Sequence, residues 1–459
     1  MTADAPAATT YPLRFVQPVV AALASAGVIT HTARQLYGYP LILPDISVPL
    51  QTWLAPITAV LMLTATAAVV AMRPSLARAC GWPIVIAGLG LVALIAQTPL
   101  LESGGDSTLV WFLVVVAASA AALGGVIVVA AHAPAAEQVA IAAGVAFGVA
   151  TRSDSPLLWI VKPGLNSPTR MLPAYIVIGL ALVAAAMAFT RPITLDATRR
   201  GFTAFVPVLA VTGVSGMIQL GHYARNLVLD VQISDGGPPS PQVTDIVTAF
   251  AEYTALALAL VAGALLLWLG YRRGRADLAR WVVLGFALGA PSLLVQFGFY
   301  YRTPVEVSGV VVTAVLATAA GIVLTLRADR LFAWDALGAA VTAVGMMIGS
   351  GHYTLQSRTP EIAFLVTIGG FAFALASGLT RAIRTTTGDA GQVALSLSLG
   401  FVALLATADA IGPASWVLLG TNGFNEFQLG PPITTLIGVG VLLLLFAFRR
   451  AGRARTIPL

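Results

Sequence analysis

Long apolar segments recur along this chain, and they restrict the folds open to it. A membrane-spanning helix needs about 20 mostly apolar residues, and about fourteen segments approach or reach that length. They lie at roughly 16–30, 53–72, 83–97, 109–131, 138–151, 171–189, 201–220, 246–270, 281–299, 305–326, 333–350, 361–380, 392–411 and 431–448. Only 10% of the residues are charged, whereas soluble domains carry about 25%. The sequence therefore predicts an all-α polytopic integral membrane protein whose apolar surface faces lipid.

The loops between these segments alternate in charge. One set is short and arginine-rich, as in YRRGRADLAR at 271–280 and RRAGRAR after 448, and the other set holds most of the acidic residues. Basic loops face the cytoplasm in membrane proteins. This alternation predicts that both termini are cytoplasmic and that the 14 helices form seven outward-pointing hairpins. Residues 1–459 then make one transmembrane domain.

The charge composition also indicates where the protein works. In a membrane protein the location of charges matters more than their sum, so the net charge of +6 is no sign of nucleic-acid binding. The predicted partner is the lipid bilayer. Lys162 stands alone against many arginines, and alanine is abundant. This bias favours a bacterial protein, and we expect a multi-pass protein of the cytoplasmic membrane.

A short phrase occurs twice in the chain. Residues 210–223 read AVTGVSGMIQLGHY and residues 340–353 read AVTAVGMMIGSGHY, without a gap. The shared Gly-His-Tyr ending carries the most information, because the chain has only 4 histidines. The two phrases fall in the seventh and eleventh predicted helices, so the repeat runs parallel. We interpret it as the trace of a multiplied ancestral hairpin.

Polar side chains gather at the outer ends of the predicted hairpins, which would form an outward-facing vestibule. Three histidines end odd-numbered helices there, with tyrosines and arginines close by in sequence. The predicted cofactor-binding residues are His31, His222, His352, Tyr223, Tyr353, Arg225 and Arg358, and the histidines among them are also the predicted metal ligands.

Two interpretations of the Gly-His-Tyr endings stay open. Neutral imidazole binds haem iron and transition metals, so His222 and His352 could hold one haem between them, with arginines paired to its propionates. Alternatively, each ending is an interfacial helix terminus, in which tyrosine lies in the aromatic belt and histidine complements the helix dipole. The Arg-Thr-Pro tips, such as 358–360, similarly fit either anion recognition or turn chemistry.

The first phrase resembles a known motif. Residues 211–225, VTGVSGMIQLGHYAR, resemble a motif of the NnrS family of haem- and copper-containing membrane proteins, which share the architecture of haem–copper oxidase core subunits. The matching positions are Gly216, Met217, Leu220, Gly221, His222 and Arg225. The resemblance implies haem binding through His222, and His352 follows only through the internal repeat. Two departures are that the family's histidine-rich N-terminal motif is missing and that fourteen helices exceed the usual twelve.

Three functions remain open at this stage, and none of them establishes whether the chain is an enzyme. The first is a haem- or metal-binding membrane protein related to electron transfer or gas ligands. The second is a transporter or lipid-handling permease with an outer vestibule, for which we expect a cavity that reaches the cytoplasmic side. The third is a non-catalytic subunit of a larger membrane complex with protein partners. No ionisable residue lies at mid-helix depth in the predicted segments, which counts against a proton- or sodium-coupled carrier.

Overall fold

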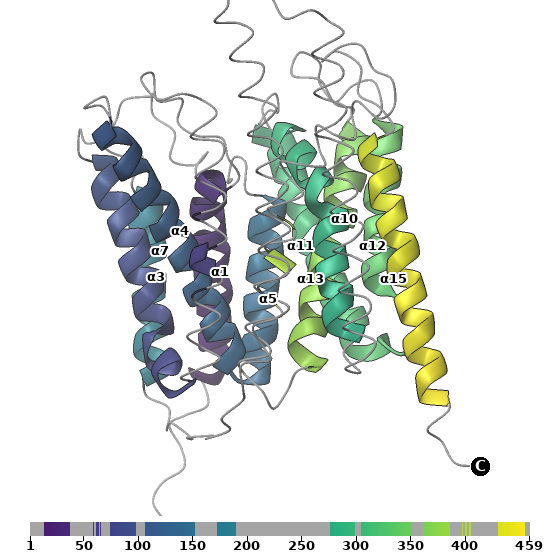
Figure 1. The fold of residues 1–459 in the computed structure, drawn as a ribbon, viewed down its shortest axis with the longest axis horizontal. Coiled ribbons are helices and arrows are strands. Elements are labelled where there is room, and N and C mark those ends of the chain that lie inside the picture. Colours follow the sequence, from purple (N-terminus) through teal and green to yellow (C-terminus); the bar gives the residue numbers. More distant parts are fainter. Residues whose placement is uncertain are drawn as a thin grey trace, which may run out of the picture.

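The structure is a bundle of helices. The computed structural model describes residues 13–36, 58, 61–63, 65, 74–97, 106–151, 172–189, 276–298, 304–349, 361–385, 397, 400, 401, 404 and 430–454. All regular secondary structure in these residues is helical. The helices stand side by side, with the chain crossing the bundle repeatedly (Figure 1).

The described helices divide by sequence into an N-terminal and a C-terminal group. The N-terminal group comprises α1 (Leu13–Leu36), α3 (Pro74–Gln97), α4 (Asp106–His132), α5 (Ala135–Ala150) and α7 (Leu172–Phe189). The C-terminal group comprises α10 (Ala276–Gly298), α11 (Pro304–Ala328), α12 (Trp334–Ile348), α13 (Glu361–Thr385) and α15 (Gly430–Ala454). In Figure 1 the first group lies at the left and the second at the right, with α5 beside the second group.

Each described helix overlaps one of the predicted apolar segments, so the prediction of an all-helical membrane protein is confirmed. Four stretches within the described helices are long and apolar enough to cross a membrane: Val110–His132, Val305–Ala328, Glu361–Arg384 and Pro432–Arg450. The predicted helices at 201–220 and 246–270 lie outside the described residues. The count of fourteen helices and the seven hairpins therefore stay predictions.

Several helices are longer than their apolar segments. Residues 73–82 and 381–391 were predicted as loops, but α3 begins at Pro74 and α13 continues to Thr385. Proline at the first helical position costs no hydrogen bond, because that N–H has no partner inside the helix. A helix can also continue past the apolar layer, because its backbone hydrogen bonds do not depend on side-chain polarity. Several arginines assigned to loops therefore lie on helix ends.

The two groups pack in the same way. Helix α3 packs along α4 just as α12 packs along α13, and α1 contacts α4 and α7 just as α10 contacts α13 and α15. The contact of α3 with α7 likewise corresponds to that of α12 with α15. Helices α1, α3, α4 and α7 thus correspond to α10, α12, α13 and α15, in the same order along the chain, whereas α5 and α11 have no counterpart among the described helices.

Glycines allow the equivalent pairs to approach closely. A Cβ added at Gly88 of α3 would lie 2.6 Å from the carbonyl oxygen of Ala118 on α4. A Cβ at Gly338 of α12 would lie 2.6 Å from the backbone nitrogen of Ala374 on α13. Small residues at such contacts are how membrane helices pack, since lipid supplies no hydrophobic force between them. The same device therefore holds α3 to α4 and α12 to α13.

This arrangement differs from the repeat predicted from the sequence. The predicted repeat matched residues 340–353 with residues 210–223, whereas the packing makes α3 the counterpart of α12. Residues 210–223 lie outside the described part of the chain, so the four-helix repeat stays a prediction. The sequence did not reveal the repeat that is visible in the packing, because that repeat consists of matching contacts between helices.

We predict that Gly88→Val destabilises the protein by about 1–3 kcal/mol, since overpacking a close contact costs that much. Gly90→Val on the same helix is the matched control, because a Cβ there meets nothing within 4 Å. Both changes replace glycine by valine in a helix, so their propensity effects cancel. Thermal unfolding of the detergent-solubilised protein measures the difference. Equal unfolding temperatures for the two variants would contradict the close-packing role.

Candidate functional site

Two features lie at one end of the bundle, which holds the α4–α5 turn, the α11–α12 turn and the C-terminal ends of α13 and α15. We call it the arginine-rich end; it is at the bottom of Figure 1. The first feature is a buried cluster of ion pairs within the C-terminal group. The second is an apolar contact between the two groups.

The ion cluster centres on Asp335 in the first turn of α12. Its carboxylate pairs with Arg280 of α10 and, at 2.5 Å, with Nη1 of Arg381 of α13. Each of the three side chains is at most 2% exposed. Asp335 also accepts a hydrogen bond of 2.9 Å from the backbone N–H of Ala336. One carboxylate thus joins three helices where water is excluded.

A second carboxylate extends the cluster to α15. Asp329, in the α11–α12 turn, accepts from Nε of Arg381 at 2.5 Å and from Nη1 of Arg449 at 3.3 Å. Asp329 is 20% exposed and Arg449 15% exposed, so this part of the cluster reaches the surface. Arg280 also lies over the ring of Phe446 on α15, 5.4 Å from the ring centroid. Arg381 therefore bridges both carboxylates.

The start of α12 favours the Asp335 carboxylate where it lies. A helix carries partial positive charge at its N-terminus, and the effect is confined to the first turn. Asp335 lies in the first turn of α12, whereas Arg381 and Arg449 lie more than one turn before the ends of α13 and α15. Burial of an ion pair costs several kcal/mol per ion, which mutual attraction and hydrogen bonds must offset. Removal of one partner is therefore strongly destabilising.

The N-terminal group is joined differently at this end. Nε2 of Gln17 on α1 donates to Oε2 of Glu137 on α5 at 3.2 Å, and both side chains are buried. Gly144 and Gly148 of α5 lie against the backbone of α1 at Ala22 and Ala26. This pattern of small residues spaced by four brings the two helix backbones close together.

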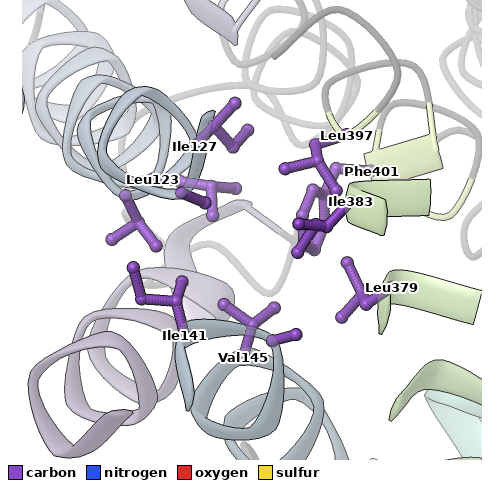
Figure 2. A pocket seen from close by; sticks show the side chains of 11 residues that line it. Leu123, Ile127, Ile141, Val145, Leu379, Ile383, Leu397 and Phe401 are labelled. Atoms are coloured by element: carbon purple, nitrogen blue, oxygen red, sulfur yellow. The ribbon is translucent and has the colours of Figure 1, made fainter. Parts of the chain in front are cut away.

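An apolar contact joins the two groups at the same end. Side chains of α4 and α5 meet those of α13 and of residues 397 and 401 around a small shared cavity (Figure 2). The cavity is lined by Leu123, Val126, Ile127, Ala130, Ile141, Ala142, Val145, Leu379, Ile383, Leu397 and Phe401. We call this contact the apolar seal.

The seal leaves little free space. Its cavity has a volume of about 10 Å³, about what one water molecule requires. Every lining side chain is apolar, and such a cavity offers water no hydrogen-bond partners. In the described part of the chain, the two groups are thus packed against each other at the arginine-rich end.

The structure locates one of the predicted site residues. His31 is half-buried on α1, near the end opposite to the arginine-rich end. No group of three or more His, Cys, Asp or Glu side chains that could hold a metal occurs among the described residues. The other predicted residues lie outside the described part of the chain: His222, His352, Tyr223, Tyr353, Arg225 and Arg358. Their predicted roles remain predictions.

The sequence interpretation missed the ion cluster because it assigned most of its members to loops. Arg280, Arg381 and Arg449 each stand next to the boundary of a predicted apolar segment, and Asp335 lies just inside another. All four fall at the same predicted end of the bundle. Opposite charges at the same predicted end of several helices could have indicated an ion cluster. The sequence does not show, however, which helices are neighbours.

Comparison with solved structures identifies the fold. The structure superposes on the fucose:proton symporter FucP of E. coli in its outward conformation, with a TM-score of 0.50 and 11% identity over 96% of this chain and 98% of that one. It matches the proton:xylose symporter XylE, bound to 6-bromo-6-deoxy-D-glucose, with a TM-score of 0.50 and 12% identity over 98% and 96% of the two chains. The chain has the fold of the major facilitator superfamily (MFS) transporters. No family model and no curated protein matches the sequence.

The MFS fold accounts for the two equivalent groups. Its two halves are parallel repeats related by an axis along the membrane normal, which is the relation that the matching helix contacts indicate. A multi-pass membrane protein follows from the same comparison.

The NnrS resemblance is therefore wrong. It rested on one stretch of fifteen residues, and the comparisons that cover nearly the whole chain find MFS transporters instead. Helices rich in alanine, valine and glycine match one another easily, so a short motif of this composition carries little information about ancestry. The MFS fold favours the transporter hypothesis over the haem-binding one.

We predict that Asp335→Asn lowers the stability of the protein by about 3–5 kcal/mol, because it leaves two buried guanidinium groups with less compensation. Asp329→Asn is the matched control and should cost less, since water reaches the Asp329 side chain. Thermal unfolding in detergent reports both. Adding Arg280→Met to Asp335→Asn should recover part of the loss. A larger effect for Asp329→Asn than for Asp335→Asn would contradict this account.

Proposed function

We propose that the protein is a transporter that works by alternating access and that the described arrangement is its state closed at the arginine-rich end. The observation that carries the proposal is the apolar seal between two equivalent helix groups in an MFS fold. Under the positive-inside rule this end faces the cytoplasm. The seal then separates the cytoplasm from the space between the groups.

The seal also changes what the transporter hypothesis should predict. From the sequence we expected a cavity reaching the cytoplasmic side. An alternating-access carrier opens one side at a time, so that expectation applies to its inward-open state and not to a state closed at this end. A packed inner end is expected of its outward state, and FucP, one of the solved neighbours, is in its outward conformation.

The outer end is then the proposed entry for substrate. His31 lies toward this end of α1, where the sequence also places the predicted vestibule of histidines, tyrosines and arginines. Hydrogen-bonding groups of this kind suit a polar or anionic substrate. The neighbours are named as fucose and xylose symporters, and we propose a small polar solute as the substrate class here as well.

The composition of the seal supports a gate that can open. Apolar contacts are non-directional, and their energy grows with the area removed from water. The described ion cluster lies wholly within the C-terminal group, so separation of α4 and α5 from α13 leaves that cluster intact. The C-terminal helices can therefore keep their internal contacts while the two groups move apart.

Distances between spin labels test the proposal. Ala136 in the first turn of α5 and Leu331 in the α11–α12 turn are both exposed and belong to different groups. Cys80, the single native cysteine, is first replaced by serine. Spin labels on Ala136→Cys and Leu331→Cys should then show two populations of inter-label distance, a shorter one in the closed state and a longer one in the open state. The pair Leu331→Cys and Phe448→Cys lies within one group and should show one population.

A single narrow distance for the Ala136–Leu331 pair, unchanged between detergent, lipid nanodiscs and different pH values, would contradict alternating access. Two populations for the control pair would instead mean that the C-terminal group does not move as a unit.

A polar substitution in the seal gives a second prediction. Leu379→Asn buries an amide without a partner in the closed state, at a cost of about 1–3 kcal/mol, and that cost is relieved on opening. The longer-distance population should therefore rise about fivefold or more relative to the shorter one. Leu316→Asn is the control, because Leu316 is 63% exposed on α11 and lies outside the seal. Equal populations in the two variants would exclude the seal as the gate.

A further inference from the structure

The carboxylates of the ion cluster are already occupied by arginines. Asp335 is paired with Arg280 and Arg381, and Asp329 with Arg381 and Arg449. These contacts also bring the α11–α12 turn beside the C-terminal end of α15, because Asp329 and Arg449 lie on these two segments. Any further arginine near the α11–α12 turn therefore has no unpaired carboxylate within the cluster to bind.

Three such arginines lie at the surface. Arg327 and Arg330 stand on either side of Asp329, and Arg450 follows Arg449 on α15. All three are exposed, and no carboxylate in the described part of the chain contacts them. Since Asp329 binds Arg449, these three arginines are within two residues of one side or the other of that contact along the chain, and they give this place a local excess of positive charge.

Exposed apolar side chains lie in the same turn. Leu331 is 74% exposed and Phe332 is 42% exposed. The ring of Phe332 lies 5.3 Å from that of Trp334, whose indole N–H donates to the carbonyl of Ala328 at 3.0 Å. Aromatic side chains with a polar edge are typical of the boundary between lipid and water. The turn therefore combines cationic groups with an apolar tip at the end of membrane-spanning helices.

We propose that Arg327, Arg330, Leu331, Phe332 and Arg450 form a binding site for the headgroup of an anionic phospholipid. Guanidinium groups bind phosphate oxygens in a bidentate manner and are weakly hydrated, which suits this ligand. Basic residues at the cytoplasmic ends of membrane helices attract anionic lipid. Leu331 and Phe332 would contact the acyl region, which a soluble phosphate lacks, so the combination favours a lipid over a free anion.

Titration of the purified full-length protein with phosphatidylglycerol or phosphatidylcholine, followed by native mass spectrometry, tests the site. The wild type should retain phosphatidylglycerol in preference to phosphatidylcholine. The triple variant Arg327→Gln, Arg330→Gln, Arg450→Gln should bind phosphatidylglycerol at least about tenfold more weakly, because each surface arginine contributes roughly a fivefold preference. Its unfolding temperature in detergent should match that of the wild type, since none of the three belongs to the ion cluster.

Two further measurements identify what is recognised. The charge-conserving variant Arg327→Lys, Arg330→Lys, Arg450→Lys should keep a preference for phosphatidylglycerol. Leu331→Ser with Phe332→Ser should weaken phosphatidylglycerol binding without affecting inorganic phosphate. Equal binding of phosphatidylglycerol by the wild type and the triple glutamine variant would overturn the proposal. Displacement of the lipid by inorganic phosphate at equal concentration would overturn it too, because the apolar contacts would then contribute nothing.

Discussion

Close backbone contact between helices is the constraint on which the structure depends. Within lipid, apolar side chains gain little by leaving one apolar environment for another, so helices associate through tight packing and polar contacts. Gly88 and Gly338 remove the Cβ atoms that would keep α3 from α4 and α12 from α13. Gly144 and Gly148 do the same for α5 against α1. The two groups exist as units because these pairs approach so closely.

Charged side chains connect the helices within the C-terminal group, whereas apolar side chains line the cavity shared by the two groups. Arg381 holds Asp335 and Asp329 together and so links α12, α13 and the α11–α12 turn, while Arg280 and Arg449 add α10 and α15. The side chains around the cavity shared by the two groups are apolar instead. Breaking a buried ion pair is costly, whereas a small apolar surface can part and close again. The proposed gate and the proposed movement of the C-terminal group as a unit both follow from where the polar groups lie.

The sequence interpretation of function followed histidines and missed the buried arginines of the ion cluster. Gly-His-Tyr drew attention because histidine is rare in this chain, and the NnrS resemblance extended it to haem. The cluster around Asp335 was overlooked because its members stand at segment boundaries, where arginine usually marks only the cytoplasmic side. Whether Arg280 faces Asp335 depends on which helices are neighbours, and hydropathy contains no information about that.

The sequence by itself determined that the chain is helical and crosses the membrane several times. In lipid each segment must satisfy its own backbone hydrogen bonds, so an apolar segment of sufficient length has to be a helix. The same pattern located the helix positions well, apart from ends that continue past the apolar layer, as at Pro74 and Thr385. Only the tertiary structure decided that α3 is the counterpart of α12, that arginines from α10 and α13 converge on Asp335, and that α4 and α5 close against α13. These facts depend on contacts between segments far apart in the chain. The bilayer requires each segment to be helical, but it does not determine which segments pack against one another.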